Sequence, residues 1–567
     1  MRLRVNKSAI IAIWSAVHPW LVPLVLFAGS LAAYSNTFTR NYTYDAAAYA
    51  TQIRNFSETG RVGWLFHPHH LLYNPLGLMA WYLLTELGLK ADPMYSLQYM
   101  NAFFGALGLV LLYEVLQRGG FRLTRTSENT RRPGGILPFT ASIVLGCAYG
   151  YWVCATDGRV TMPGLVGIIL VLGLAWGMVE AASLVQCLML AGATVLAIGL
   201  HQSHGILMLA AVGSILLGQI PLSKRASFAL IYLSITGIGI AVMYLGVGVF
   251  IKGFSSYTEL KAWILAYAQD GRWWDFNILN NLLGDVSALV HAFISPDVEL
   301  YRLISNSISV IFALGVFLPV ILSTSHAFLI QTEPSRNVSL YVRRSIILAL
   351  IALPYAAFFT VWTPGYFVFW MPVAIVLIVW IAESAVGWNP RAQMLFAALW
   401  MICTIGILYT NLSTSILPRT QSNTNPDLVF CEAFAKYAKP GDLILITGTY
   451  AGSSTPLPYA EVYIPYFTRV SVRSMSVELK RENGDVAEVI RSIRGIMRNR
   501  IRSGHKVFIL DEFRSDATWS DLTERYRGVR NMDERILSGY SLKPIENINA
   551  FITYELVESS SLINQTL

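Results

Sequence analysis

Charged residues are scarce in this chain. Only 13% of its 567 residues are Asp, Glu, Lys or Arg, and 54% are hydrophobic, whereas soluble domains carry about 25% charged residues. This scarcity excludes a chain built only of soluble domains. A membrane-spanning helix needs about 20 apolar residues, so the longest uncharged runs must each hold two helices. The uncharged runs include 133–156, 160–179, 181–223, 226–251, 303–332, 345–382 and 392–418.

The sequence also lacks the common patterns for disulfides, zinc and nucleotides. Its 5 cysteines lie mostly in apolar runs and show no CxxC spacing, which argues against a disulfide framework and a zinc ribbon. There is no Walker loop and no GxGxxG, so no nucleotide site is expected. The net charge of +8 comes from basic residues dispersed over short loops. Such dispersal is an orientation signal of membrane proteins, and it predicts no nucleic-acid partner.

Short basic loops set the expected topology. The loop 118–135 carries five arginines against one glutamate, and loops of this kind stay on the cytoplasmic side. The N-terminus, Lys224–Arg225 and 336–344 are basic in the same way. All of them share one side only if 70–88 lies in the membrane interface rather than crossing. About eleven spans result, near 10–34, 96–117, 136–154, 162–180, 184–200, 204–219, 226–250, 303–323, 345–362, 366–384 and 392–411.

This topology places the N-terminus in the cytoplasm and the C-terminus on the outer side, with long outer loops at 36–95 and 253–302. From residue 422 onward charges become frequent. There, AKPGDLILITGTY and SGHKVFILDEF are typical of buried strands, and 428–438 and 485–502 carry helical patterns. We therefore predict a polytopic α-helical membrane domain over 1–421, followed by a small α/β domain over 422–567 on the outer face.

Acidic residues beside the predicted spans are candidate site residues, because ionisable groups at membrane level are costly unless they serve a function. Asp45 follows the first span and is placed to act as a general base. Its alternative role is to cap a helix N-terminus. Asp157 is placed to ligate a metal or to organise a lipid phosphate through a cation, with Arg159 as a direct phosphate partner. The alternative for Asp157 is again a helix N-cap.

Histidines form a second group of candidates. His67, His69 and His70 stand together in FHPHHLLYNPLG and could bind a divalent metal or, when protonated, a phosphate. Otherwise they suit the membrane interface. His201 and His204 interrupt an uncharged stretch, as phosphate or substrate contacts or as a polar helical turn. The second outer loop adds aromatic side chains of the kind that stack on sugar rings or lie in interface helices: Trp263, Tyr267, Trp273 and Trp274.

The order of these motifs resembles the GT-C fold glycosyltransferases, in the branch that contains protein O-mannosyltransferases and aminoarabinose transferases. The resemblance implies that Asp45 is the base, that His67 contacts a metal or a lipid phosphate, and that Asp157 is the second acidic residue. It also implies a phosphate-binding helix break at 199–202 and a late aromatic motif around Tyr366. The chain lacks the family's lysine directly after the histidine segment, and after the third span it has only Asp157 in place of a paired DxD. The need for a divalent metal stays open, with Asp45, His67 and Asp157 as candidate ligands.

The resemblance implies a membrane glycosyltransferase that moves a sugar, with inversion, from a polyprenyl-phosphate donor to a hydroxyl of a glycan, lipid or protein acceptor. The reaction would occur on the outer side of a bacterial inner or plasma membrane. Two other functions remain. A transporter or flippase of lipid-linked glycans would show inverted repeats and charges near mid-membrane. A non-catalytic membrane scaffold would show no clustering of the acidic residues and histidines.

Overall fold

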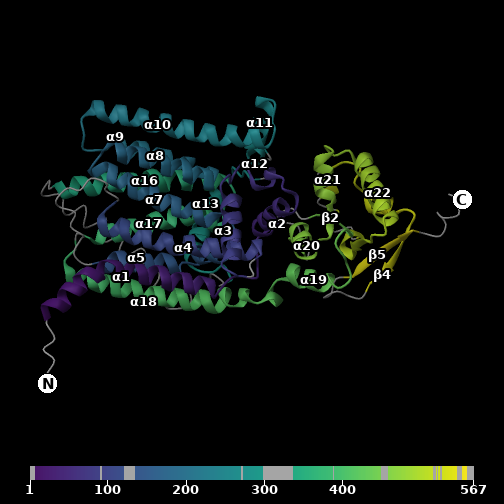
Figure 1. Cartoon of the computed structure of the whole chain (residues 1–567), viewed down its shortest axis with the longest axis horizontal. Helices are drawn as coiled ribbons and strands as arrows, with labels where there is room; N and C mark the ends of the chain where they lie inside the picture. The colour runs from purple at the N-terminus through teal and green to yellow at the C-terminus, as the bar shows by residue number, and fades with distance from the viewer. Residues whose placement is uncertain are drawn as a thin grey trace, which may run out of the picture. The chain divides into compact units, whose positions relative to one another are not determined.

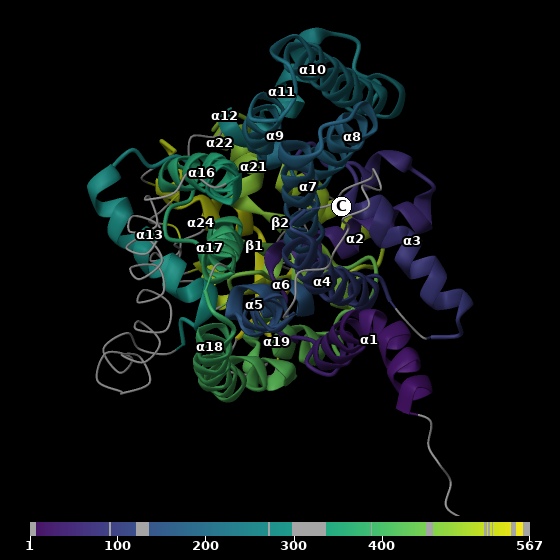
Figure 2. The same cartoon turned by 90° about the vertical axis from the view of Figure 1, so that its left-hand side faces the viewer.

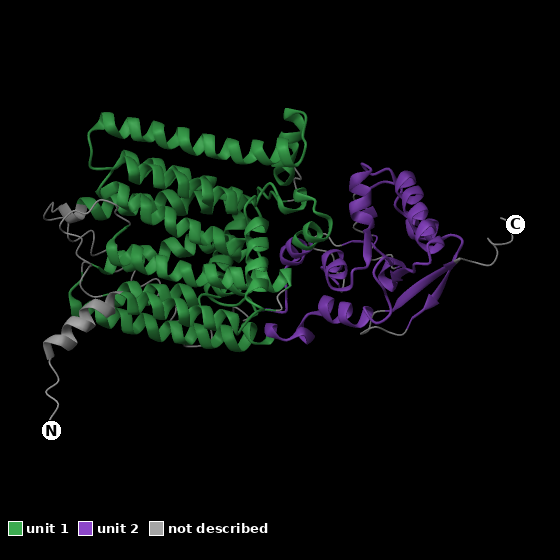
Figure 3. Ribbon diagram, in the orientation of Figure 1, with its two compact units in different colours: residues 1–38, 52–418 green, residues 39–51, 419–567 purple. Residues whose placement is uncertain are grey.

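The chain forms two compact units. The computed structural model describes residues 7–89, 92–120, 135–269, 273–297, 336–386, 388–448, 457–514, 519, 522–523, 526–545 and 552–558. The first unit comprises residues 1–38 and 52–418, and the second comprises 39–51 and 419–567 (Figure 3). The second unit therefore contains a short piece of the first predicted outer loop in addition to the C-terminal domain.

The first unit is a bundle of long helices that run alongside one another and are seen end-on in Figure 2. Apolar side chains fill the space between them, with Trp176, Tyr149 and Tyr151 completely buried. The bundle contains α1 (Lys7–Ser35), α4 (Pro93–Arg118), α5 (Ile136–Cys147), α6 (Tyr149–Thr156), α7 (Thr161–Glu180), α8 (Leu184–Leu200), α9 (Leu207–Leu216), α10 (Leu222–Leu245), α16 (Arg336–Val361), α17 (Met371–Ala385) and α18 (Pro390–Asn411).

Six helices of the described residues are long and apolar enough to cross a membrane, and α5 with α6, bent by 66°, makes a seventh if the pair is one span. Shorter apolar helices cover Trp20–Ser35, Leu184–Leu200, Gln202–Leu216 and Ile278–Phe293. The predicted class of polytopic helical membrane protein is confirmed. The predicted span 303–323 lies outside the described residues, so the count of about eleven stays a prediction.

Shorter helices lie between the long ones: α2 (Tyr44–Thr59), α3 (Tyr73–Glu86), α11 (Tyr257–Ile264), α12 (Ala266–Gln269) and α13 (Ile278–Phe293). Of these, α3 runs across the direction of the bundle helices (Figures 1 and 2). It has 14 residues, too few for a straight span. Its length and direction agree with the expectation that 70–88 does not cross the membrane.

The second unit has a five-stranded sheet in the order β2-β1-β3-β5-β4. Parallel pairing joins β1 (Leu443–Ile446) to β2 (Ser471–Ser474) and β3 (Val507–Leu510), and antiparallel pairing joins β5 (Thr553–Glu558) to β3 and β4 (Tyr540–Pro544). The two predicted strands are β1 and β3. The helices are α19 (Pro426–Phe434), α20 (Ala460–Thr468), α21 (Met475–Arg481), α22 (Val486–Arg502) and α24 (Met532–Leu537). A C-terminal α/β domain is thus confirmed.

Candidate functional site

Asp157 lies in a tight buried loop between α6 and α7. It is the residue after the last one of α6, while Val160 precedes α7 without a side-chain cap. The interpretation of Asp157 as a helix N-cap is therefore wrong. Its side chain is completely buried. One carboxylate oxygen accepts a hydrogen bond from the backbone N–H of Gly158 at 2.8 Å, and the other accepts one from Nε of Arg159 at 3.1 Å. A buried ion pair results, in which Asp157 orients the guanidinium of Arg159.

Neighbouring helices hold the backbone of this loop. The four consecutive carbonyls of residues 156–159 each accept a hydrogen bond from a side chain. Gln98 donates to the carbonyl of Thr156 at 2.8 Å. Asn101 donates to the carbonyl of Asp157 at 2.7 Å and to that of Arg159 at 2.6 Å. The hydroxyl of Tyr73 donates to the carbonyl of Gly158 at 2.6 Å. Buried carbonyls need such partners, so α3 and α4 fix the loop that carries Arg159.

Arg159 also reaches a turn that is distant in sequence. Its Nη1 lies 3.3 Å from the hydroxyl oxygen of Tyr366. Tyr366 follows a turn in which Thr363 and Gly365 have φ angles of 52° and 77°, and a positive φ is uncommon for a residue other than glycine. The backbone N–H of Gly365 donates to Asp285 at 3.3 Å. The turn thus places Tyr366 against Arg159.

The histidines form one cluster of five rings from two chain segments. His67 and His70 stack with ring centroids 5.5 Å apart, and His67 and His69 are 5.7 Å apart. His70 meets His201 at 4.6 Å, and His201 meets His204 at 5.4 Å. The backbone N–H of Gln202 donates to the carbonyl of His69 at 2.9 Å, which joins the two segments. The structure therefore brings all five predicted histidines together.

Two histidines of the cluster also have local structural roles. The ring of His201 accepts from the backbone N–H of Ser203 at 3.3 Å and lies 2.7 Å from the Ser203 hydroxyl. It thereby caps the short 3-10 helix Gln202–Ile206. His204 is buried, and its Nδ1 lies 2.6 Å from the hydroxyl of Tyr355. The interpretation of this segment as a polar helical turn is therefore correct. The same turn also brings His201 and His204 into the cluster.

Burial keeps these histidines uncharged. Burial, with smaller contributions from His69 and Lys252, lowers the pKa of His67 to about 3. Burial lowers the pKa of His69 to about 4. The pKa values of His70 and His201 also lie well below the usual range, for the same main reason. These rings are neutral near pH 7, so they can donate and accept hydrogen bonds but bring no positive charge to a phosphate.

The positive charge nearest to His67 in these contacts belongs to Lys252, which the sequence reasoning did not single out. Its Nζ donates to the carbonyl of Gly63 at 2.6 Å, next to the histidine segment. The only sequence signal is its place at the end of the uncharged run 226–251. Within the described ranges, no carboxylate lies within ion-pair distance of Lys252. Its charge is therefore open to an anion.

The acidic loop and the histidine cluster belong to one site in the first unit. The backbone N–H of Tyr73 donates to the carbonyl of His70 at 3.2 Å, while the hydroxyl of Tyr73 holds the 156–159 loop. On the other side, Phe369 contacts both Tyr366, at 5.1 Å, and His201, at 6.5 Å between ring centroids. Seven predicted residues of the first unit thus join Tyr366 in a continuous set of contacts: His67, His69, His70, Asp157, Arg159, His201 and His204.

Aromatic residues of the second outer loop border the histidines. The ring of Tyr267 lies 4.6 Å from that of His69 and 6.0 Å from that of Trp273. Nε2 of His69 and Nε1 of Trp273 are buried without a partner among the described residues. Trp274 instead packs on Trp362. Tyr267 and Trp273 are therefore the predicted sugar-stacking residues that adjoin the cluster.

Asp45 belongs to the second unit. It is exposed and lies in the first turn of α2, a helix that begins in the second unit and ends in the first. The hydroxyl of Thr43 accepts from the backbone N–H of Ala46 at 3.4 Å, so Thr43 is the capping side chain. The N-cap interpretation of Asp45 is therefore wrong. A carboxylate in the first turn is favoured by the helix dipole.

The donor set does not fit a metal centre. Among the residues that the structure describes, no three His, Cys, Asp or Glu side chains are arranged to hold a metal ion. Both carboxylate oxygens of Asp157 are already engaged by Gly158 and Arg159.

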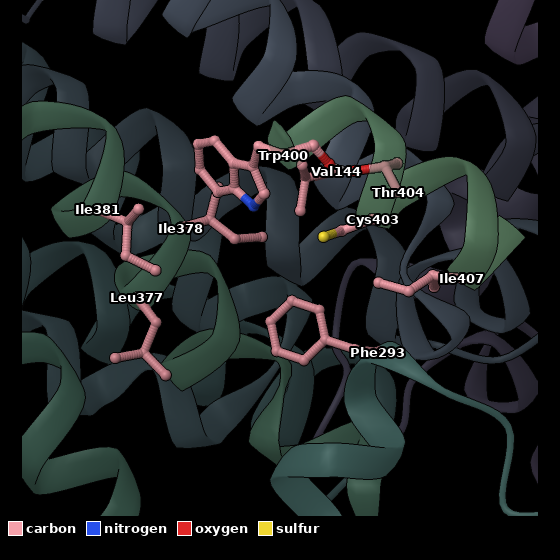
Figure 4. Close-up of a pocket in the computed structure, with 9 residues that line it drawn as sticks. All are labelled: Val144, Phe293, Leu377, Ile378, Ile381, Trp400, Cys403, Thr404 and Ile407. Atoms are coloured by element: carbon pink, nitrogen blue, oxygen red, sulfur yellow. Dashed lines mark hydrogen bonds between the residues drawn. The ribbon is translucent and has the colours of Figure 1, made fainter. Parts of the chain in front are cut away.

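A separate pocket lies among α5, α13, α17 and α18. The side chains that line it are apolar apart from Thr404 and Cys403 (Figure 4). Its lining side chains include no carboxylate, imidazole or cation. Its remaining lining residues are Val144, Phe293, Leu377, Ile378, Ile381, Trp400 and Ile407.

The bundle with its crossing helix and the C-terminal α/β domain have a fold that solved structures share over nearly the whole chain. Two solved structures that share it are those of ArnT, an aminoarabinose transferase, from Cupriavidus metallidurans. The form bound to undecaprenyl phosphate aligns over 97% of this chain and 98% of its own, at 12% identity and a TM-score of 0.54. The apo form aligns over 95% and 98%, at 12% identity and a TM-score of 0.57.

The resemblance inferred from the sequence is thus confirmed for the fold. No family model matches the chain, and no curated protein matches it.

Proposed function

We propose that this protein is a membrane glycosyltransferase that moves a sugar from a polyprenyl-phosphate donor to an acceptor hydroxyl, with inversion, on the extracytoplasmic side of a bacterial inner or plasma membrane. One observation carries the proposal. Arg159 and Lys252, two cations, lie at the two ends of a set of neutral histidines. This set lies in a fold that, in ArnT, has been solved with undecaprenyl phosphate bound.

The leaving phosphate is the group that these side chains suit. Breaking the bond between the anomeric carbon and the phosphate oxygen leaves negative charge on the lipid phosphate. Donors placed where that charge develops give the largest catalytic effect. The charge of Arg159 is partly offset by Asp157, whereas that of Lys252 is not. Lys252 therefore attracts the phosphate, and the neutral imidazoles donate hydrogen bonds to its oxygens.

The acceptor side needs a base. Asp45 takes the proton of the acceptor hydroxyl as its oxygen forms a bond to the anomeric carbon. The bond to phosphate breaks on the opposite face, so the anomeric configuration inverts. The electron pair leaves with the lipid phosphate, and the proton stays on Asp45. The sugar ring rests on Tyr267 and Trp273, whose neighbour His69 has a free ring nitrogen among the described residues.

The two alternative functions fit these observations less well. A flippase would need charges at mid-depth, whereas the buried charges of Glu180 and Arg344 lie near the ends of α7 and α16. A scaffold gives no reason for Asp157, Arg159 and five histidines to join in one set of contacts. That clustering supports a binding site for an anion.

The first test is binding of undecaprenyl phosphate to the full-length protein in nanodiscs, with undecaprenol as the ligand that lacks only the phosphate. We expect the phosphate to raise affinity at least tenfold, because hydrogen bonds to charged groups contribute roughly 1.5–3 kcal/mol each. Equal affinity for both lipids would overturn the proposed phosphate site.

The second test concerns the reaction. Undecaprenyl-phosphate-linked sugars and a cell-envelope extract supply donor and acceptor, and transfer of label from lipid is measured. Asp45→Asn should abolish transfer and leave undecaprenyl phosphate binding unchanged. Glu58→Gln, in the last turn of the same helix, is the matched control. Full transfer by Asp45→Asn would remove Asp45 as the base.

A further inference from the structure

The segment that precedes Asp45 is held by the C-terminal domain. The backbone N–H of Arg40 donates to the carbonyl of Arg419 at 2.6 Å, and the hydroxyl of Thr39 donates to the same carbonyl at 3.4 Å. Thr39 and Arg419 are 380 residues apart in the sequence, yet residues 39–51 belong to the same compact unit as 419–567. The first outer loop is therefore built into the C-terminal domain at this point.

Asn425 joins this segment to the domain. Its side-chain oxygen accepts from the backbone N–H of Leu428 at 3.2 Å and so caps α19. Its side-chain nitrogen donates to the carbonyl of Arg40 at 2.8 Å and to the hydroxyl of Tyr463 at 2.9 Å. Asn425 is buried. One amide group thus caps the start of α19 and fixes the loop backbone at Arg40.

Tyr463, in α20, completes the attachment. Its hydroxyl donates to the carbonyl of Tyr42 at 2.6 Å. The ring of Tyr42 stacks on that of Phe467 at 5.8 Å between centroids. Tyr463 and Tyr42 are both buried. Two residues later, the ring of Tyr44 meets that of Tyr459 at 6.4 Å, and Asp45 is the next residue. The contacts just described join residues 39–44 to α19, α20 or the residues that flank them.

The domain itself holds α20 in place. α20 packs on α19 and on β2. The carboxylate of Asp427, in the first turn of α19, accepts from the backbone N–H of Tyr459 at 3.1 Å and so fixes the start of α20. The position of the loop therefore depends on the folded α/β domain and not on the loop alone.

We propose that the C-terminal domain serves as the positioning element for Asp45, with Asn425 and Tyr463 as positioning residues. This inference rests on the proposed function, because it assigns the domain a role in placing the proposed base. Neither side chain touches substrate. They fix the backbone at Arg40 and Tyr42, shortly before α2 begins at Tyr44. A base displaced by about 1 Å can lose roughly a hundredfold in rate.

The test separates positioning from folding and from donor binding. Tyr463→Phe keeps the ring and removes the hydrogen bond to Tyr42. Asn425→Asp keeps the helix cap and removes the donor to Arg40. We expect kcat for transfer to fall ten- to a hundredfold, with KM for the lipid donor unchanged. Hydrogen exchange of backbone amides over 39–47 should become faster in both variants, which reports the loosened loop independently of activity.

Matched controls are available in the same chain. Tyr554→Phe removes a tyrosine hydroxyl that bonds to Asp511, inside the C-terminal domain but away from the loop. Asn389→Asp changes another asparagine helix cap, that of α18. Both should keep wild-type kcat. If either domain variant does not fold, Tyr42→Leu loosens the attachment from the loop side and should give the same loss of kcat.

The outcomes distinguish this inference from the proposed function. Suppose that Asp45→Asn abolishes transfer, while Tyr463→Phe, Asn425→Asp and Tyr42→Leu transfer at the control rate although their hydrogen exchange over 39–47 rises. Positioning by the domain is then overturned, and the proposed function stands. If Asp45→Asn transfers normally, the proposed base is wrong, whatever the domain variants do.

Discussion

The side-chain amide of Asn101 lies 2.6 Å from the carbonyl oxygen of Arg159, and the same nitrogen lies 2.7 Å from that of Asp157. A single residue of α4 therefore holds the backbone on both sides of Gly158. Asn101 does not reach the exposed end of the site, but it fixes the loop from which the guanidinium of Arg159 extends towards Tyr366.

Asn101→Leu should weaken binding of undecaprenyl phosphate and lower stability. Two buried carbonyls lose their donor, at a cost of roughly 1–3 kcal/mol, and Arg159 loses its fixed position. Asn411→Leu is the matched control, because Asn411 also donates to two buried carbonyls, at 2.9 and 3.2 Å, outside the site. We expect both variants to unfold at lower temperature and only Asn101→Leu to lose affinity. Equal affinities would show that the loop does not act on binding.

Lys252→Met should weaken binding of undecaprenyl phosphate by about tenfold or more, since hydrogen bonds to charged groups contribute roughly 1.5–3 kcal/mol. Binding of undecaprenol should not change. Lys252→Arg keeps the charge and should keep most of the affinity. Lys261→Met removes an exposed lysine of the neighbouring helix α11 and serves as control. An unchanged affinity in Lys252→Met would remove this lysine from the phosphate site.

Much of the fold follows from the sequence, because uncharged runs of sufficient length have few alternatives to membrane helices. The site was predicted by residue type more than by geometry. Asp157 and the histidines stand out because ionisable groups are rare beside such runs. Tyr73 and Asn101 do not stand out, since a polar residue inside an amphipathic helix looks the same whether it faces a loop or another helix.

Contacts between distant segments are what the sequence did not reveal. Lys252 is a single lysine after an apolar run, and its meaning depends on the position of Gly63. The attachment of residues 39–44 to Asn425 and Tyr463 joins the two ends of the chain. No periodicity or motif encodes such a pairing, because the hydrogen bonds to Arg40 and Tyr42 are made by backbone carbonyls that every residue carries.

Acid should destabilise the histidine cluster. The pKa values of His67 and His69 in the folded protein, about 3 and about 4, lie below the ordinary value of 6.5 for the unfolded chain. Between these values the unfolded state binds more protons, so stability falls as pH falls. The contribution of the two neutral histidines to stability is complete above pH 6.5 and is lost progressively towards pH 3–4. We expect the unfolding temperature to drop over this window.

Replacing both rings tests this assignment. The double variant His67→Gln with His69→Gln should flatten the fall of unfolding temperature between pH 6.5 and pH 4, because glutamine does not titrate. A pH profile that is unchanged in the double variant would mean that other groups govern the acid sensitivity.

Arg344 should prove the most important single charge for the stability of the bundle. This buried residue of α16 forms ion pairs with Glu180 of α7 and Glu383 of α17, donates to the carbonyl of Gly119 at 2.7 Å, and lies 5.0 Å from the ring centre of Trp176. Arg344→Met leaves two buried carboxylates without their cation, and removing one partner of a buried pair costs roughly 3–5 kcal/mol. The measurement is thermal unfolding in detergent.

Neutral replacements of the two glutamates decide whether uncompensated charge causes the loss of stability in Arg344→Met. Glu383→Gln leaves one carboxylate for one guanidinium and should cost less than Arg344→Met. Adding Glu180→Gln and Glu383→Gln to Arg344→Met removes the unpaired charges and should recover part of the lost stability, since uncharged replacements of buried pairs are often neutral. If the triple variant were less stable than Arg344→Met alone, the loss would lie in packing against Trp176 and in the bond to Gly119 rather than in uncompensated charge.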